Sequence, residues 1–265
     1  MLYIVATPIG NLSEMSGRAI EVLKSVDLIA AEDTRHSSKL LKHFGIETKT
    51  VVYQKFNERE SAKGLVDLML SGKSVALISD AGMPLISDPG SVLVDRCIEN
   101  GLQIVVVSGA CAAINAVVLS GFSLESFSFL GFLPDKESAR KDKISSYLFS
   151  PSALIFYCPP QNVDKDLNFL FNCLGKRSVV IARELTKKFE SVYRGKLGED
   201  FSKINKSGEF VIVVEGYKGE KEKRSILEIY QEYLSLGLSK MEAMKAAAKD
   251  LGISKSEVYS ALNKS

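Results

Sequence analysis

The chain has 265 residues, a formal net charge of +2 and 46% hydrophobic residues, a composition typical of a globular enzyme with one large or two medium domains. No apolar run reaches the roughly 18 residues of a membrane span, and the N-terminus lacks the basic start and long apolar core of a secretory signal. The small net charge excludes a globally basic surface, so any nucleic-acid binding must come from local patches.

The first 107 residues alternate between short apolar runs and amphipathic segments. We expect strands at 3–6, 27–31, 51–53, 75–79 and 103–107, and helices between them at 18–24, 37–44, 59–70 and 89–99. Continuous apolar strands separated by helices indicate a parallel sheet covered on both faces. Asp88 and Pro89 fit the cap and first position of the last helix.

The second half begins with an Ala-rich helix at 110–119. Strands are expected at 127–131, 153–157, 178–183 and 209–215, with helices at 138–148 and 163–174. The segment 187–194 has the pattern of a further strand. This half is therefore predicted to contain a mixed sheet.

The last 47 residues form a third segment. Ser239 with Glu242, and Ser254 with Glu257, are capping boxes that predict two short helices, and Gly252 suits the end of the first. Two interpretations of this segment stay open: a helix-turn-helix that contacts nucleic acid, and a helical cap on the body. Its charge does not decide between them, because the segment holds eight basic and seven acidic residues. We expect domains at 1–112 and 113–218, a linker at 218–224 and a tail at 219–265 that serves RNA engagement rather than folding.

Cysteine and histidine usage predicts no metal site. The four cysteines follow no zinc-binding spacing and are expected to be reduced thiols, and the two histidines lack a third ligand. These residues are Cys97, Cys111, Cys158, Cys173, His36 and His43.

Ligands of open parallel sheets bind beyond the carboxyl ends of the strands. Three loops rich in Gly, Pro or small residues leave strands at that edge, at 6–11, 79–90 and 108–113. The first is not GxGxxG, which disfavours an ordinary dinucleotide fold. Asp80 is suited to accept hydrogen bonds from a ribose or an α-amino group. The cluster after the second strand contains more charged residues than a helix cap at Thr34 requires. It therefore predicts the edge of a polar pocket, formed by Glu32, Asp33 and Arg35.

Six segments resemble one known family. They are TPIGN at 7–11, AAEDTRHSSKLLKHFGI at 30–46, ALISDAGMPLISDPG at 76–90, GFLPDK at 131–136, ARELTKKFE at 182–190 and GEFVIVVEG at 208–216. The chain resembles the tetrapyrrole methylase superfamily, and within it the ribosomal RNA small subunit methyltransferase I branch. The resemblance implies a cytoplasmic homodimer of two α/β domains with S-adenosylmethionine in the cleft between them. It also implies methylation of a cytidine ribose 2′-hydroxyl in the decoding region.

The same resemblance places cofactor contacts at Ile9, Gly10, Asp80, Gly82, Met83, Cys111, Ala112, Tyr157, Ala182 and Phe210. For catalysis we select Glu32 and Asp33 as bases and Arg35 to position phosphate. For RNA contact we select basic residues, because Lys and Arg bind phosphate independently of sequence. These residues are Lys136, Arg140, Lys141, Lys143, Arg183, Lys187 and Lys188.

Two segments depart from the family pattern. SGACA at 108–112 stands where the family usually has Pro-Gly-Pro-Ser-Ala, and CPPQN at 158–162 where it usually has Glu-Ser-Pro-His-Arg. Three alternatives therefore stay open. They are methylation of a corrin precursor, methylation of a protein as in diphthamide synthesis, and a non-catalytic RNA-binding assembly factor. The basic helix at 136–143 and the tail argue against the first.

Overall fold

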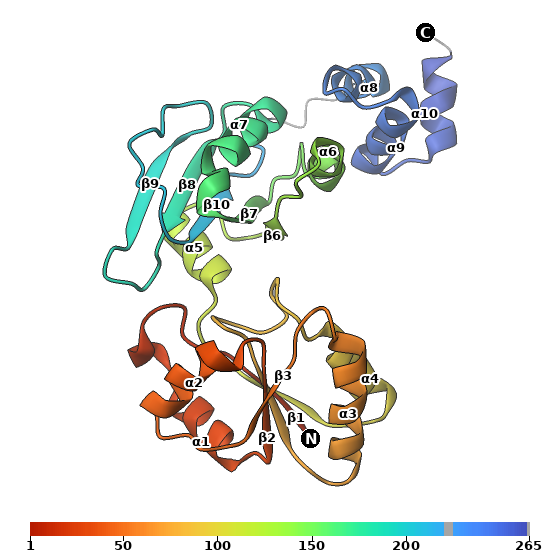
Figure 1. The fold of residues 1–265 in the computed structure, drawn as a ribbon. Coiled ribbons are helices and arrows are strands. Elements are labelled where there is room, and N and C mark those ends of the chain that lie inside the picture. The colour runs from red at the N-terminus through yellow and green to blue at the C-terminus, as the bar shows by residue number, and fades with distance from the viewer. Residues whose placement is uncertain (220–224, 264–265) are drawn as a thin grey trace. The chain divides into compact units, whose positions relative to one another are not determined.

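The protein, in a computed structural model that describes residues 1–219 and 225–263, consists of two compact units (Figure 1). Unit 1 contains residues 1–115 together with 184–191, and unit 2 contains the remaining described residues. The sequence does not predict that the short segment 184–191 belongs to unit 1. Most of the expected linker at 218–224 lies outside the described residues.

Unit 1 is built on a parallel five-stranded sheet of order β3-β2-β4-β1-β5, as the apolar runs predict. Its strands are β1 (Leu2–Val5), β2 (Leu28–Ala31), β3 (Thr50–Val52), β4 (Val75–Ile78) and β5 (Ile104–Val107). Its helices are η1 (Leu12–Glu14), α1 (Gly17–Ser25), α2 (Thr34–His43), α3 (Glu58–Leu70) and α4 (Ser91–Glu99), with α5 (Ala112–Ser120) leading into unit 2.

Two hydrophobic cores, one on each face, hold this sheet. Helices α1 and α2 cover one face and α3 and α4 the other (Figure 1). Successive strand residues point to opposite faces, so Val75 and Leu77 pack with α3 and α4 whereas Ala76 and Ile78 pack with α1 and α2. Burial on both sides explains why the inner strands β2 and β4 are apolar at every position.

Unit 2 contains a mixed five-stranded sheet of order β6-β7-β10-β8-β9. Strand β10 is antiparallel to both β7 and β8, while β6 and β7 are parallel. The strands are β6 (Phe127–Phe132), β7 (Ala153–Cys158), β8 (Ser178–Arg183), β9 (Ser191–Lys196) and β10 (Phe210–Val214). The helices before the tail are α6 (Glu137–Ser145), η2 (Pro160–Asn162) and α7 (Val163–Leu174).

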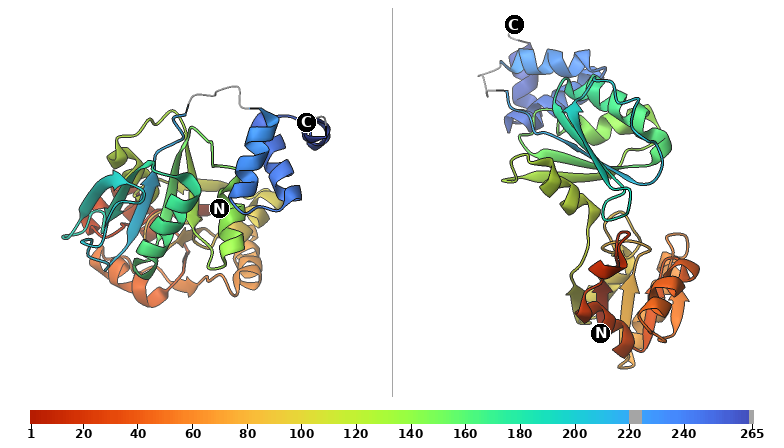
Figure 2. Two further views of the ribbon diagram at one scale, coloured as in Figure 1. Left: turned by 90° about the horizontal axis from the view of Figure 1, so that it is seen from above. Right: turned by 90° about the vertical axis from the view of Figure 1, so that its left-hand side faces the viewer.

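The tail forms helices α8 (Ile226–Ser235), α9 (Lys240–Leu251) and α10 (Lys255–Leu262), which pack together (Figure 2). Each begins with a capping box, and Gly252 ends α9 in the left-handed conformation as predicted. The sequence interpretation missed α8. Tyr233, Ala247 and Val258 are buried in the same hydrophobic cluster as α6, α7 and the sheet of unit 2. The tail therefore contributes to a domain core, which supports the helical-cap interpretation.

None of the described helices combines the length and the apolar character needed to cross a membrane.

Candidate functional site

The three loops selected from the sequence come together at the carboxyl edge of the unit 1 sheet. Thr7, after β1, donates its backbone N–H to the carbonyl of Gly82 at 2.9 Å and accepts the N–H of Gly82 at 3.1 Å. The Thr7 hydroxyl also donates to the Ser79 carbonyl at 3.2 Å. The loops after β1 and β4 are thus fixed to each other by backbone geometry.

Two glycines allow this close approach. Gly82 has φ +84°, and a Cβ there would lie 3.1 Å from the Ile9 side chain and 3.6 Å from the Ala110 carbonyl. A Cβ on Gly109 would lie 2.8 Å from Cβ of Ala6. Larger residues would push the loops after β1, β4 and β5 apart, so glycine is required for their convergence.

The loop after β4 carries backbone strain. Leu85 and Ser87 have φ of 71° and 74°, which L-residues with side chains rarely adopt. Strained positions of this kind cluster at functional sites because the surrounding structure must enforce them. The predicted cap of α4 by Asp88 is wrong. The helix begins at Ser91, and its N-terminal backbone is instead satisfied by Glu58 of α3, which accepts the Gly90 N–H at 2.8 Å.

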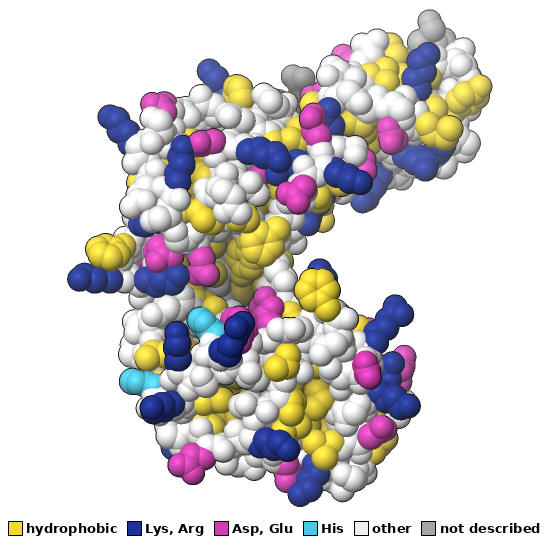
Figure 3. All heavy atoms as spheres, in the orientation of Figure 1, with side chains coloured by type: hydrophobic (Ala, Val, Ile, Leu, Met, Phe, Trp, Pro, Cys, Tyr) yellow, Lys and Arg dark blue, Asp and Glu magenta, His cyan; other side chains and the backbone are white. Residues whose placement is uncertain are grey.

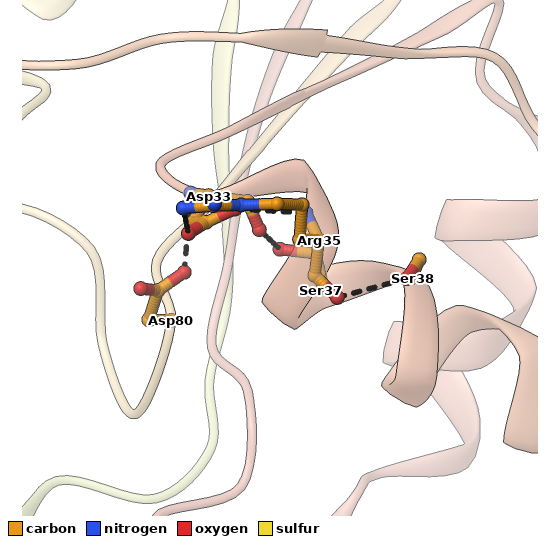
Figure 4. A network of polar contacts seen from close by, with 5 residues as sticks. All are labelled: Asp33, Arg35, Ser37, Ser38 and Asp80. Carbon is orange, nitrogen blue, oxygen red and sulfur yellow. Dashed lines mark hydrogen bonds and ion pairs between the residues drawn. The ribbon is translucent and has the colours of Figure 1, made fainter.

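Asp33 and Arg35 form hydrogen bonds and an ion pair with each other at the start of α2. Asp33, rather than Thr34, caps the helix by accepting the Arg35 N–H at 2.8 Å, and it also pairs with the Arg35 guanidinium at 2.7 Å. These hydrogen bonds lower the pKa of Asp33 below its usual range. Figure 4 shows Asp80 reaching this group from the neighbouring loop, where it accepts the Asp33 N–H at 3.2 Å. A carboxylate held this way is a poor proton acceptor, so Asp33 is the weaker of the two predicted bases.

Three carboxyl groups, those of Glu32, Asp80 and Asp88, lie close enough to interact electrostatically. Burial and the charge of Asp80 raise the pKa of Glu32, and the nearby backbone of Asp80 opposes this effect only in part. Burial and the charge of Glu32 raise the pKa of Asp88 to about 7. The described residues hold no group of three such side chains arranged for a metal ion. A group of carboxyl side chains of this kind suits a cationic ligand.

Segment 184–191 contributes Lys187 to unit 1. A Cβ on Gly10 would lie 2.3 Å from the Lys187 side chain, so the aliphatic stem of this lysine lies on the loop after β1. Its ammonium pairs with Glu184 at 2.8 Å. Glu184 and Thr186 have positive φ, so strain recurs in this segment. The sequence predicts Lys187 as an RNA contact and gives no indication of this packing.

The remaining cofactor residues selected from unit 1 occupy the expected loops. Ile9 and Gly82 are buried, and Met83, Cys111 and Ala112 are half-buried. In unit 2, Tyr157 and Ala182 are both cross-strand partners of Val211 and therefore share one face of the sheet. Phe210 points to the opposite face and is 2% exposed in the core. The structure brings Tyr157 and Ala182 together and separates the Phe210 side chain from them.

Two of the basic residues predicted to bind RNA are buried. Arg140 is 1% exposed and pairs with Asp166 at 2.8 Å, and Arg183 donates to the Ser207 carbonyl at 2.7 Å. Neither guanidinium is available to a phosphate. Lys136 and Lys188 are exposed, and Lys141 and Lys143 are half-buried. Lys and Arg side chains are interspersed with acidic ones on the face in Figure 3, in keeping with the low net charge.

Comparison with known proteins identifies the class to which this fold and site belong. Residues 1–200 match the family model of tetrapyrrole (corrin/porphyrin) methylases. Solved structures with the same fold include the methyltransferase CobJ, with a TM-score of 0.62 and 15% identity over 81% of this chain and 93% of that one. A diphthine synthase has a TM-score of 0.62 and 14% identity over 81% and 89% of the two chains. The chain belongs to the tetrapyrrole methylase family.

Relatives of higher identity define the branch. A protein of Halalkalibacterium halodurans named ribosomal RNA small subunit methyltransferase I is 42% identical, with 97% of this chain and 93% of the relative covered. A protein of that name from Vibrio cholerae is 48% identical, with 84% of this chain and 80% of the relative covered. The one from Bacillus subtilis is 40% identical, with 98% of this chain and 93% of the relative covered. The predicted resemblance to the ribosomal RNA small subunit methyltransferase I branch is thus confirmed.

Proposed function

We propose that this protein transfers a methyl group from S-adenosylmethionine to small-subunit ribosomal RNA, at the 2′-hydroxyl of a cytidine ribose in the decoding region. The observation that carries the proposal is the match to the relatives named above along nearly the whole chain. The site in unit 1 supports it, because glycine-bearing loops converge there beside carboxylates that suit a cationic cofactor. When bound, S-adenosylmethionine supplies an electrophilic methyl group.

Glu32 is our candidate for the group that accepts the proton of the hydroxyl nucleophile. Its pKa is raised by burial and by Asp80, which moves it toward the operating pH and makes it a better base than Asp33. Asp80 holds the backbone at Asp33 and thereby fixes the start of α2 next to Glu32. For cofactor contact we propose the loops at 8–10, 80–83 and 109–112, with the Asp80 carboxylate as a side-chain acceptor.

For RNA contact we propose Lys136 and Lys188, which are exposed, and leave out Arg140 and Arg183, which are buried. A cytoplasmic homodimer is part of the proposal. Exposed apolar side chains of unit 2 would contribute to an interface between copies, and these are Val118, Leu119, Leu124 and Phe127.

The experiment that tests the proposal compares small-subunit rRNA from a strain lacking the gene with rRNA from the parent. Nuclease digestion and mass spectrometry should show the loss of one 2′-O-methylcytidine, and its return on complementation. Purified protein should restore the modification on subunits from the deletion strain. Identical nucleoside profiles in the two strains would contradict the proposal and favour another substrate, such as a corrin precursor.

A further inference from the structure

Phe56 lies in the loop between β3 and α3 and has a relative exposure of 101%. A single exposed apolar side chain is ordinary on a protein surface. Its meaning depends on how the ring is held, on which charges surround it and on where the loop lies in the sheet.

The loop is anchored to the body of unit 1 by Tyr53. This residue is fully buried, and its N–H donates to the carbonyl of Ala31 in β2 at 2.8 Å. Its hydroxyl donates to Glu58 at 3.2 Å, and Glu58 in turn accepts the N–H of Gly90. The start of α3 is thus connected to the strained loop after β4. Phe56 projects from a segment that is fixed at both ends.

Phe56 also lies within a closed turn. The Asn57 N–H donates to the carbonyl of Gln54 at 3.1 Å, and the Asn57 side chain accepts the Gln54 N–H at 3.1 Å. Lys55 and Phe56 occupy the two central positions of the turn. Because the backbone is already ordered, little conformational entropy is lost when the ring contacts a partner.

Two exposed cations lie near Phe56 along the chain. Lys55 precedes it and Arg59 lies in the first turn of α3, and neither forms an ion pair with any residue that the structure describes. Glu58 points inward to the α4 backbone, which leaves Glu60 as an exposed acid of this turn. An aromatic ring between two cations is the combination with which proteins hold single-stranded nucleic acid.

The loop leaves the carboxyl edge of the sheet, as do the loops that carry Glu32 and Asp80. With strand order β3-β2-β4-β1-β5, Phe56 comes first along this edge, followed by Glu32, Asp80 and then Gly10. The Lys187 stem lies on Gly10.

A second exposed ring belongs to the same segment as Lys187. Phe189 is 67% exposed, and the ammonium of Lys188 lies 5.5 Å from its ring centroid. Exposed aromatic rings with adjacent cations are therefore found in two places. Phe56 lies in the loop after β3, and Phe189 lies in the segment 184–191, which contacts the loop after β1.

We propose that Phe56 stacks on an unpaired base of the RNA substrate while Lys55 and Arg59 contact the adjoining phosphates, and that Phe189 with Lys188 binds the strand in the same way. The inference rests on the proposed function and adds how the substrate is held. It requires a single-stranded segment, since bases within a duplex do not offer their faces. Stacking gives affinity with little sequence preference, so the reaction site must select the nucleotide.

The test measures binding of a labelled single-stranded RNA of about 12 nucleotides by fluorescence anisotropy at fixed ionic strength. Phe56→Ala and Phe56→Leu should weaken binding by about tenfold to a hundredfold, whereas Phe56→Trp should retain it, because only an aromatic ring stacks. Ile98→Ala is the matched control. Ile98 is 65% exposed near the end of α4. This helix leads to β5, the edge strand at the other side of the sheet from β3. Replacing Lys55 and Arg59 by Gln should reduce the salt dependence of affinity by about 0.7 per residue in the log–log slope.

Wild-type affinity in Phe56→Ala, or equal affinity in the Leu and Trp variants, would overturn the stacking role even if the wild type methylates rRNA. A wild type that neither binds this RNA nor methylates small subunits would overturn the proposed function as well. Calorimetry with S-adenosylmethionine should give the same affinity for all variants, because the substituted side chains are exposed and lie outside the loops proposed to contact the cofactor.

Discussion

Replacing Asp166 by Asn should destabilise the protein strongly, because it leaves a buried guanidinium without a counter-charge. The Arg140 and Asp166 side chains are each 2% exposed, and Nη1 lies 2.8 Å from Oδ1. Arg140 also donates to the Pro134 carbonyl at 2.6 Å and lies over the Phe169 ring. These contacts hold the guanidinium in place, so it cannot turn out to water when its partner is lost.

Breaking a buried ion pair from one side typically costs about 3–5 kcal/mol. With a urea dependence of about 2 kcal/mol per M, this lowers the unfolding midpoint by roughly 2 M. Asp164→Asn is the matched control in the same helix. Asp164 pairs with Lys206 at the surface, where both side chains are substantially exposed, and an exposed pair contributes only about 0–1 kcal/mol.

Far-UV circular dichroism is the suitable readout, since the chain has no tryptophan. Asp166→Asn should unfold at much lower urea than Asp164→Asn. The double variant Arg140→Met/Asp166→Leu should recover much of the loss, because it removes both charges. Equal midpoints for Asp166→Asn and the wild type would refute the ion-pair argument. A loss of RNA binding in the stable double variant would return Arg140 to the RNA-contacting set.

Four further predictions concern the site and the tail. Glu32→Gln should lower kcat by about 10²–10⁴-fold, as single-turnover kinetics at saturating cofactor would show. Asp80→Ala should weaken cofactor binding at least about tenfold, the value of a charge-assisted hydrogen bond, and unchanged affinity would make Asp80 only a loop residue. The pKa of Asp88 is about 7 in the folded chain against 3.8 for the free group, so the stability that its protonation contributes is fully present below pH 3.8 and is lost as pH rises through 7. Asp88→Asn should therefore unfold at higher urea than the wild type at pH 8, and the gap should close toward pH 4. A chain ending at Gly219 should be insoluble or less stable, because the tail fills part of the unit 2 core, and a stable truncated protein would disprove that role.

The element order and both sheets were predictable because apolar periodicity is local. The start of α4 was not. Asp88 and Pro89 have the right residue types for a cap. The Gly90 N–H instead donates to Glu58, which lies 32 positions earlier in the chain. The interpretation of Arg140 as a surface residue failed for a similar reason, since its partner belongs to α7. Helix α8 is a different case, because Ser225 and Glu228 carry the same capping box as the helices that were identified.

The candidate site was predictable in its loops and not in its electrostatics. Strand ends followed by Gly and small residues place the loops at 6–11, 79–90 and 108–113 on one edge of the sheet. Which carboxylate is free to act depends on partners in three dimensions. Asp33 is committed to Arg35, whereas Glu32 keeps a raised pKa through burial and Asp80.

The departure of CPPQN from the family motif at 158–162 can now be located physically. Cys158 is 3% exposed, and its thiol donates to Asp166 at 3.2 Å, so the side chain at this position points into the core of unit 2. Asp166 supplies a carboxylate next to position 158, and this carboxylate neutralises Arg140. The absence of the family's Glu at 158 therefore leaves no unpaired charge in the core. The Cys158 change by itself is thus weak support for a non-catalytic protein. Substitutions of Glu32 and Asp80, at the carboxyl edge of the unit 1 sheet, are the decisive ones for the proposed chemistry.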